Sequence, residues 1–139
     1  MESIPFDKGA VIREVLHNAI EATIAIGSIK ATPVVGAKAI AISITEAGVV
    51  NNRSGAFTFF VSNDGTNFTA YNMIIDNSTN TNGQTLARVA SKTRNSVGTD
   101  IVFFTPETLG GITHIKVVPT ITDGASPVGT FTVTATISF

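Results

Sequence analysis

The chain has 139 residues, the length of one ordinary domain, which is enough to bury a core without covalent staples. It has no cysteine, which excludes a disulfide framework and thiolate metal sites, and its net charge of −1 argues against nucleic acid or an anionic membrane as a partner. Only 14% of its residues are charged, against roughly 25% in typical soluble proteins. This fits either a surface covered by neighbouring subunits or a small β domain with threonine at exposed strand positions.

The first twenty residues are interpreted as an N-terminal arm or first strand, ahead of a single domain over 21–139. The large apolar residues of this arm are Ile4, Phe6, Val11, Ile12 and Val15. Alternation of apolar and polar residues favours two short strands over 10–16 and 19–26, separated at His17 and Asn18, with a helix over 10–26 as the alternative.

Period-two alternation predicts further strands, separated by turn-forming residues. The expected strands cover 39–45, 55–62, 68–75, 85–92, 100–105, 112–120 and 130–139. The expected turns and loops lie at 48–55, 63–67, 76–84 and 93–99, and around Asp123, Gly124 and Pro127. The hairpin around the Asp-Gly turn at 63–67 is the strongest of these signals. The sequence therefore predicts an all-β fold, a single antiparallel β-sandwich or jelly-roll-like domain of about eight or nine strands.

Aromatic residues are expected mainly in the core. Phe57, Phe59, Phe68 and Phe103 are the predicted core phenylalanines. The alternative is that Tyr71, with Phe60 and Phe68, forms an aromatic platform for a sugar.

Residue patterns that carry catalysis or metal binding are absent from the sequence. His17, expected in a turn, and His114, expected on a strand surface, have no second ligand at metal-binding spacing. No nucleophile motif, phosphate-binding loop or cofactor motif occurs, and the acidic residues are scattered. An enzyme would need a carboxylate pair that the sequence does not show. We therefore expect no enzymatic activity, metal or cofactor.

The loop at 63–67 has two interpretations. Its Asp and Asn oxygens would suit Ca²⁺, but the repeat of acidic ligands and the closing Glu of a calcium loop are missing. A backbone turn explains it better, because Asp-Gly forms the turn and asparagine tolerates left-handed backbone. At the exposed tip of a hairpin, Asn63, Asp64 and Asn67 are candidate contact residues.

Arg88, Lys92 and Arg94 form the one basic cluster. It is interpreted as a solvated strand edge, where lysine commonly blocks further strand pairing. Contact with an acidic neighbour or a phosphate backbone is the alternative.

Two segments, FVSNDGTNFTAYNMIIDNSTNTNG and ITHIKVVPTITDGASPVGTFTVTATI, resemble small β-sandwich domains of tailed-bacteriophage virion proteins, over about 37–139. The resemblance implies an accessory structural protein, such as a capsid decoration or another head or tail component. Such a protein binds copies of itself and other virion proteins, uses no cofactor and is assembled in the host cytoplasm. The resemblance also implies that the first twenty residues are a docking arm, which makes its large apolar residues candidate docking residues, namely Ile4, Phe6, Val11, Ile12 and Val15. The sequence shows neither a signal peptide nor an apolar run long enough to cross a membrane.

The hairpin also resembles those of discoidin-like sandwiches. This second resemblance implies a carbohydrate-binding module, which is the alternative function.

Overall fold

The structure is a computed structural model that describes residues 9–76, 86–104 and 106–139. Its strands are β1 (Val11–Ile20), β2 (Thr32–Pro33), β3 (Ala39–Ser62), β4 (Thr69–Ala70), β5 (Met73–Asp76), β6 (Leu86–Val89), β7 (Ser91–Arg94), β8 (Gly98–Phe103) and β9 (His114–Ser138). Two 3-10 helices, η1 (Ile26–Ser28) and η2 (Pro106–Gly111), complete the described elements. All strand pairs are antiparallel and belong to one sheet of order β1-β9-β3-β8-β5-β6, with β2 on β9 and β4 and β7 on β3. The predicted all-β antiparallel fold is confirmed.

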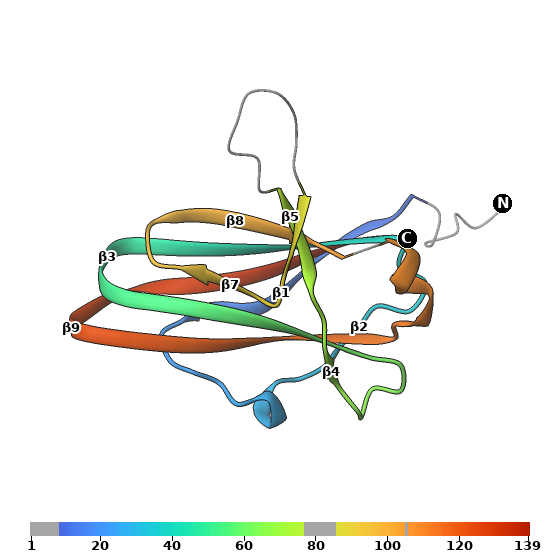
Figure 1. The fold of residues 1–139 in the computed structure, drawn as a ribbon, viewed down its shortest axis with the longest axis horizontal. Coiled ribbons are helices and arrows are strands. Elements are labelled where there is room, and N and C mark those ends of the chain that lie inside the picture. Colours follow the sequence, from blue (N-terminus) through green and yellow to red (C-terminus); the bar gives the residue numbers. More distant parts are fainter. Residues whose placement is uncertain (1–8, 77–85, 105) are drawn as a thin grey trace, which may run out of the picture.

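The fold is built on β3 and β9, which pair from Ala39 opposite Ser138 to Ser62 opposite His114. This long ribbon turns back on itself, so that its two halves run one above the other (Figure 1). We call 39–47 with 130–138 the first arm of the ribbon, and 53–62 with 114–122 the second arm. The sheet is therefore curled around its own interior.

The bend of the ribbon lies where both strands depart from regular pairing. The register shifts between Ala47 and Arg53, and positive φ angles occur at Gly48 and Asn52 on β3 and at Ser126 and Gly129 on β9. Bulges with left-handed residues turn a strand sharply without ending its pairing. Sequence reasoning predicted separate turns at 48–55 and around Asp123, and this was wrong because the two strands bulge together and stay paired.

The core lies between the two arms. Alternate side chains of both arms are buried there, among them Ile40, Ile42, Ile44, Phe57, Phe59, Ile115, Val117, Phe131, Val133, Ala135 and Ile137. The rings of Phe57 and Phe131 meet edge to face with centroids 5.5 Å apart, joining one arm to the other. The predicted core positions Phe57 and Phe59 are confirmed. Phe103 was predicted wrongly, since its side chain is 44% exposed on the outside of β8.

One side of the curl is closed by β7 and β8. β7 pairs with the second arm from Gly55 to Thr58, whereas β8 pairs with the first arm from Ala41 to Glu46. These two strands therefore bridge the arms. The predicted loop at 93–99 is shorter than expected, because β7 continues to Arg94 and β8 begins at Gly98.

The opposite side is bridged by β1 and the segment that follows it. β1 pairs with the first arm of β9, and the Nε2 atom of His17 lies 2.7 Å from the carbonyl oxygen of Val117 on the second arm. His17 is thus a buried strand residue, which corrects its interpretation as a turn residue. The predicted strand at 19–26 was also wrong. Positive φ at Ala19 and the end of β1 at Ile20 lead into a segment that contains η1.

The predicted hairpin around 63–67 is present in part. Only Thr69 and Ala70 return alongside β3, opposite Val61 and Phe60. The chain then leaves the second arm as β5, which pairs with β6 and β8 instead. Most of the loop expected at 76–84 lies outside the described residues.

Candidate functional site

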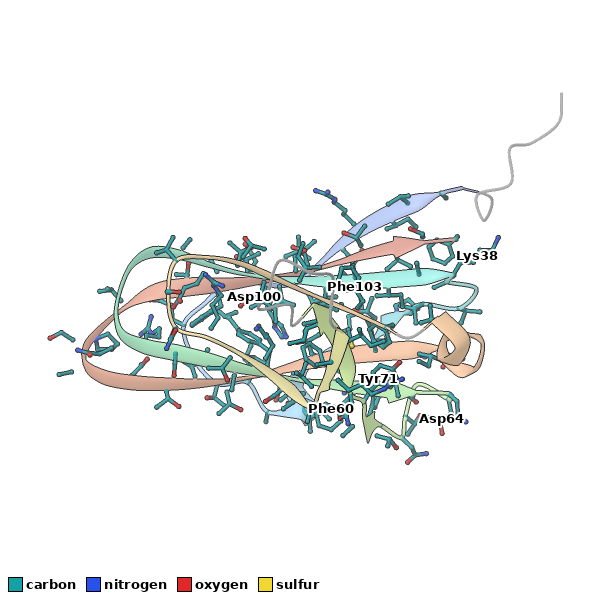
Figure 2. All side chains as sticks on the ribbon, turned by 45° about the horizontal axis from the view of Figure 1, so that its top comes forward. Lys38, Phe60, Asp64, Tyr71, Asp100 and Phe103 are labelled. Carbon is teal, nitrogen blue, oxygen red and sulfur yellow. The ribbon has the colours of Figure 1, made fainter. Side chains whose placement is uncertain are left out.

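The predicted contact residues lie in two separate elements. Val11, Ile12 and Val15 lie on β1 with exposed fractions of 61%, 47% and 57%, which is high for apolar residues on a strand. The loop that bears Asn63, Asp64 and Asn67 follows β3 and projects at one end of the molecule (Figure 2). Ile4 and Phe6, the other predicted docking residues, lie outside the described residues.

The loop after β3 is held by the side chain of Asp64. Its Oδ1 atom accepts hydrogen bonds from the Ser62 hydroxyl and the Thr66 and Asn67 backbone N–H groups, each at 2.8 Å. Its Oδ2 atom accepts one from the Asn67 Nδ2 atom, also at 2.8 Å. These bonds, led by those from Asn67 and Thr66, hold the pKa of Asp64 well below its ordinary value. Both carboxylate oxygens are therefore engaged within the loop, as the turn interpretation requires.

The first arm presents a sheet surface that we call the outer face. In β strands, residues directly opposite each other share a face. The registers therefore place on it Val11, Arg13 and Val15 of β1, Thr132, Thr134, Thr136 and Ser138 of β9, Ala39, Ala41, Ser43 and Thr45 of β3, and Thr99, Ile101 and Phe103 of β8. Arg13 is the single charged residue among them. Small and hydroxyl side chains occupy the centre, and large apolar side chains lie on both flanks.

A shallow hollow of about 390 Å³ lies on this face beside Phe103. Its lining is mostly apolar and includes Ala39, Ala41, Thr136 and Ile74, and Ile74 on β5 lies opposite Phe103. An apolar hollow between a phenylalanine and small residues can receive an apolar side chain from a partner surface. The outer face therefore combines a centre of small side chains with a recess for an anchoring residue.

A second hollow, of about 420 Å³, lies at the bend of the ribbon and is polar. Arg53 lines it together with Asp123. The Arg53 guanidinium donates to Asp123 at 2.7 and 3.3 Å, to Glu21 at 3.0 Å and to the Gly129 carbonyl at 2.5 Å. Because its donors are directed at groups of the protein itself, we interpret Arg53 as a clamp on the bend and not as an anion-binding residue.

A polar group of side chains also lies inside the curl, near β7 and β8. Asp100 is paired with Arg94 at 2.9 Å and with Lys92 at 3.9 Å. The side chain of Arg94 is only 14% exposed. The interpretation of Lys92 and Arg94 as solvated side chains was therefore wrong, because both are directed toward Asp100. Among the described strands β7 pairs only with β3, so its interpretation as an edge strand holds.

Glu46 is the most unusual member of this interior. Its side chain is 1% exposed, and neither carboxylate oxygen has a hydrogen-bond partner. Burial raises the pKa of Glu46, and the positive charges of Arg94 and Arg53 oppose this shift. A raised carboxyl pKa is typical of acid–base catalysts, but neither hollow described above is lined by Glu46.

Two of the three residues of the predicted sugar platform contact other side chains. The Tyr71 ring stacks on Phe104 with centroids 4.9 Å apart, so one of its faces is occupied. The Phe68 ring lies beneath the Lys116 ammonium, 4.5 Å from its centroid. The carbohydrate-binding alternative stays a prediction that no observed contact favours.

No three His, Asp or Glu side chains in the described ranges come close enough together to hold a metal ion. Within the same ranges, no helix has the length and apolar character needed to span a membrane.

Comparison with known proteins adds no assignment: no protein-family model, curated protein or solved structure matches the chain.

Sequence reasoning found Val11 and Val15 of the outer face but missed the face itself, and its third candidate on β1, Ile12, lies on the opposite side of the strand. The alternation of Ala41, Ser43 and Thr45 with buried isoleucines was visible as a pattern. The strand order that places Ile101 and Phe103 beside them required the registers of distant segments.

Proposed function

We propose that this protein is a non-enzymatic structural component of a phage virion, a capsid decoration or another head or tail component, and that the outer face is its assembly surface. The two arms are then the layers of a jelly-roll-like sandwich. The phage identity rests on the resemblance of 37–139 to virion sandwich domains. The use of the outer face rests on its composition.

The single observation that carries the proposal is the near absence of charge on the outer face. Natural sheets that face solvent usually carry charged residues, both for solubility and to prevent association. Covering a charged surface costs free energy unless every charge finds a partner. Among the fourteen residues named above only Arg13 would require one, and Arg88 of β6, opposite Ile74, adds a second charge at the margin of the face. Thr and Ser can satisfy their hydroxyls through their own strands or through water. The face can therefore be buried at low cost.

The exposed apolar residues indicate where such contacts are strongest. Ile101 and Phe103 are 49% and 44% exposed on one flank, and Val11 and Val15 are exposed on the other. Phe103 lines the recess, and a group of exposed apolar residues on one face marks an interaction site. A small soluble domain gains nothing from leaving these four residues in water.

The first test concerns the setting of the gene. We expect its neighbours to encode a major capsid protein, a portal or tail components. Neighbours that encode only metabolic enzymes would count against the phage identity.

The second test concerns the face. Capsids assembled from the major capsid protein encoded beside this gene are sedimented with the purified chain. We expect wild type to co-sediment and Thr134→Glu, which adds a charge at the centre of the face, to remain in solution. The matched control is Thr120→Glu, because Thr120 is an exposed threonine of β9 on the second arm. Equal binding by both variants would reject the outer face as the assembly surface.

A further inference from the structure

The outer face ends at β1, a strand with one unpaired edge among the described residues. β1 pairs with β9 in unbroken register from Val11 to Val15, and its register shifts come only after Val15. The carbonyl of Ala10 accepts a hydrogen bond from the Phe139 N–H group. Because backbone groups alternate in direction along a strand, Val11, Arg13 and Val15 point their N–H and C=O groups away from β9. These groups can pair with another strand.

This edge has few of the devices by which natural proteins protect exposed strands, its charged residues Arg13 and Glu14 being the exception. Residues 11–15 contain no proline, lysine or bulge. β2, in contrast, is two residues long and includes Pro33, and β4 is also two residues long. Short strands and proline discourage pairing with a second molecule, whereas a longer edge with apolar side chains invites it. Val11, Ile12 and Val15 are exposed on this segment.

We propose that β1 pairs antiparallel with β1 of a second copy of this chain, across a two-fold axis that passes through Ile12 perpendicular to the sheet. The inference deepens the proposed function and rests on it for its biological purpose. The occupant must itself offer an unpaired strand edge, and β1 of another copy is such an edge. A two-fold axis makes the contact self-complementary and closes it at two molecules.

The position of the axis follows from the two charges of the segment. An axis through Arg13 would place Arg13 opposite itself, and an axis through Glu14 would do the same for Glu14. Like charges directly opposite each other destabilise a strand pair. An axis through Ile12 instead places the two Ile12 side chains together and sets Val11 opposite Arg13 of the second copy. This register avoids both repulsions and stays clear of the shifts after Val15.

The pairing also enlarges the assembly surface. An axis perpendicular to the sheet leaves both outer faces on the same side, so that the two copies form one continuous surface. Each copy contributes fourteen outer-face residues according to the strand registers. One copy falls short of the roughly 20–30 residues that each partner supplies to a standard interface, and two copies together reach that range. A dimer would therefore bind firmly to a capsid that a single chain would bind weakly.

Disulfide trapping tests the register directly, because the chain has no native cysteine. Ile12→Cys places two thiols in a non-hydrogen-bonded cross-strand pair, with Cα atoms about 4.5 Å apart, which a disulfide can span. We expect this variant to form a covalent dimer on mild oxidation of the dilute protein. The control is Val15→Cys, which is equally exposed but would lie about 20 Å from its equivalent, six residues along the strand. Cross-linking of Val15→Cys, or equal cross-linking of both variants, would overturn the proposal.

Blocking the edge provides a test that needs no new bond. The Arg13 N–H points away from β9, so Arg13→Pro removes a donor from the open edge without removing one from the β1–β9 ladder. In size-exclusion chromatography with light scattering, we expect dimers for wild type and for the control Arg13→Ala, and monomers for Arg13→Pro. Circular dichroism checks that the variants keep the wild-type fold. A monomeric wild type, or a dimeric folded Arg13→Pro, would refute the edge pairing.

These results can be separated from the test of the proposed function. A chain that dimerises through β1 but does not bind capsids retains this inference and loses the function. A monomeric chain that binds capsids through the outer face retains the function and loses this inference.

Discussion

Replacing Arg53 by alanine should destabilise the protein by about 3 kcal/mol, because this one side chain ties together both strands of the bend. Arg53 lies on β3, Asp123 and Gly129 lie on β9, and Glu21 belongs to the segment after β1. The Arg53 side chain is 7% exposed, whereas those of Asp123 and Glu21 are 39% and 64% exposed. The removal therefore leaves carboxylates that water can reach.

The magnitude follows from three contributions. The exposed pair with Glu21 is worth about 0.5 kcal/mol, as in other surface ion pairs. The bidentate bond to Asp123 and the bond to the Gly129 carbonyl involve a buried guanidinium, so each contributes about 1–1.5 kcal/mol. Arg53→Lys keeps a charge but loses the paired geometry, and we expect it to cost about half as much as alanine.

Urea unfolding followed by far-ultraviolet circular dichroism measures these changes, since the chain has no tryptophan and only one tyrosine to report by fluorescence. Glu21→Gln serves as a control and should change the unfolding free energy only slightly. A loss below about 0.5 kcal/mol for Arg53→Ala, the size of an ordinary surface substitution, would refute the role of Arg53 as a clamp.

Three further predictions concern packing and pH. Gly55→Ala should lower the free energy of unfolding by about 2 kcal/mol, because the new Cβ would lie 2.8 Å from the Phe57 ring and 3.0 Å from the Phe131 ring. Gly110 has open space around it, so Gly110→Ala should leave the unfolding free energy unchanged in the same urea titration. Glu46→Gln should be more stable than wild type at neutral pH. Burial raises the folded-state pKa of Glu46 above its ordinary value near 4.5. Wild type should therefore lose stability as the pH rises above 4.5, whereas Glu46→Gln should not. A stability difference between the two proteins that stays constant with pH would contradict the burial of Glu46 as a charge. Asp64→Ala should lower the melting temperature. The folded-state pKa of Asp64 is depressed below its ordinary value near 3.8. The stability advantage of wild type over Asp64→Ala should therefore persist above pH 3.8 and disappear only in stronger acid. An advantage that is already lost at pH 5 would argue against the observed hydrogen bonds.

Local alternation predicted much of the strand content of this fold. The buried isoleucines at 40, 42 and 44 and the run from Phe131 to Ile137 were read correctly because one face of each strand is buried. Turn signals were less reliable. The Asp123-Gly124 pair predicts the end of a strand, but the partner strand bulges opposite it and the ladder continues. A single segment cannot reveal that its partner, some seventy residues away, bends at the same place.

The candidate site shows the same limit. Val11, Ile12 and Val15 were found because they are large apolar residues of the first twenty, which the resemblance to virion proteins suggested as a docking arm. The outer face exists only after β1, β9, β3 and β8 are placed side by side. Glu46 and Arg53 were missed because they resemble ordinary surface charges until the bend encloses them.

The long β3–β9 ladder also has a consequence for the order in which the chain folds. Its partners are 52 residues apart at Ser62 and His114 but 99 residues apart at Ala39 and Ser138. Closing the loop between Ser62 and His114 costs about 0.6 kcal/mol less free energy than closing the longer one, because the entropy lost is smaller. Pairing should therefore begin beside the loop at 63–67 and proceed around the bend. The high contact order predicts slow folding. Since β1 and the first arm of β3 both require residues 131–138 as a partner, a nascent chain cannot present its outer face until β9 has been synthesised.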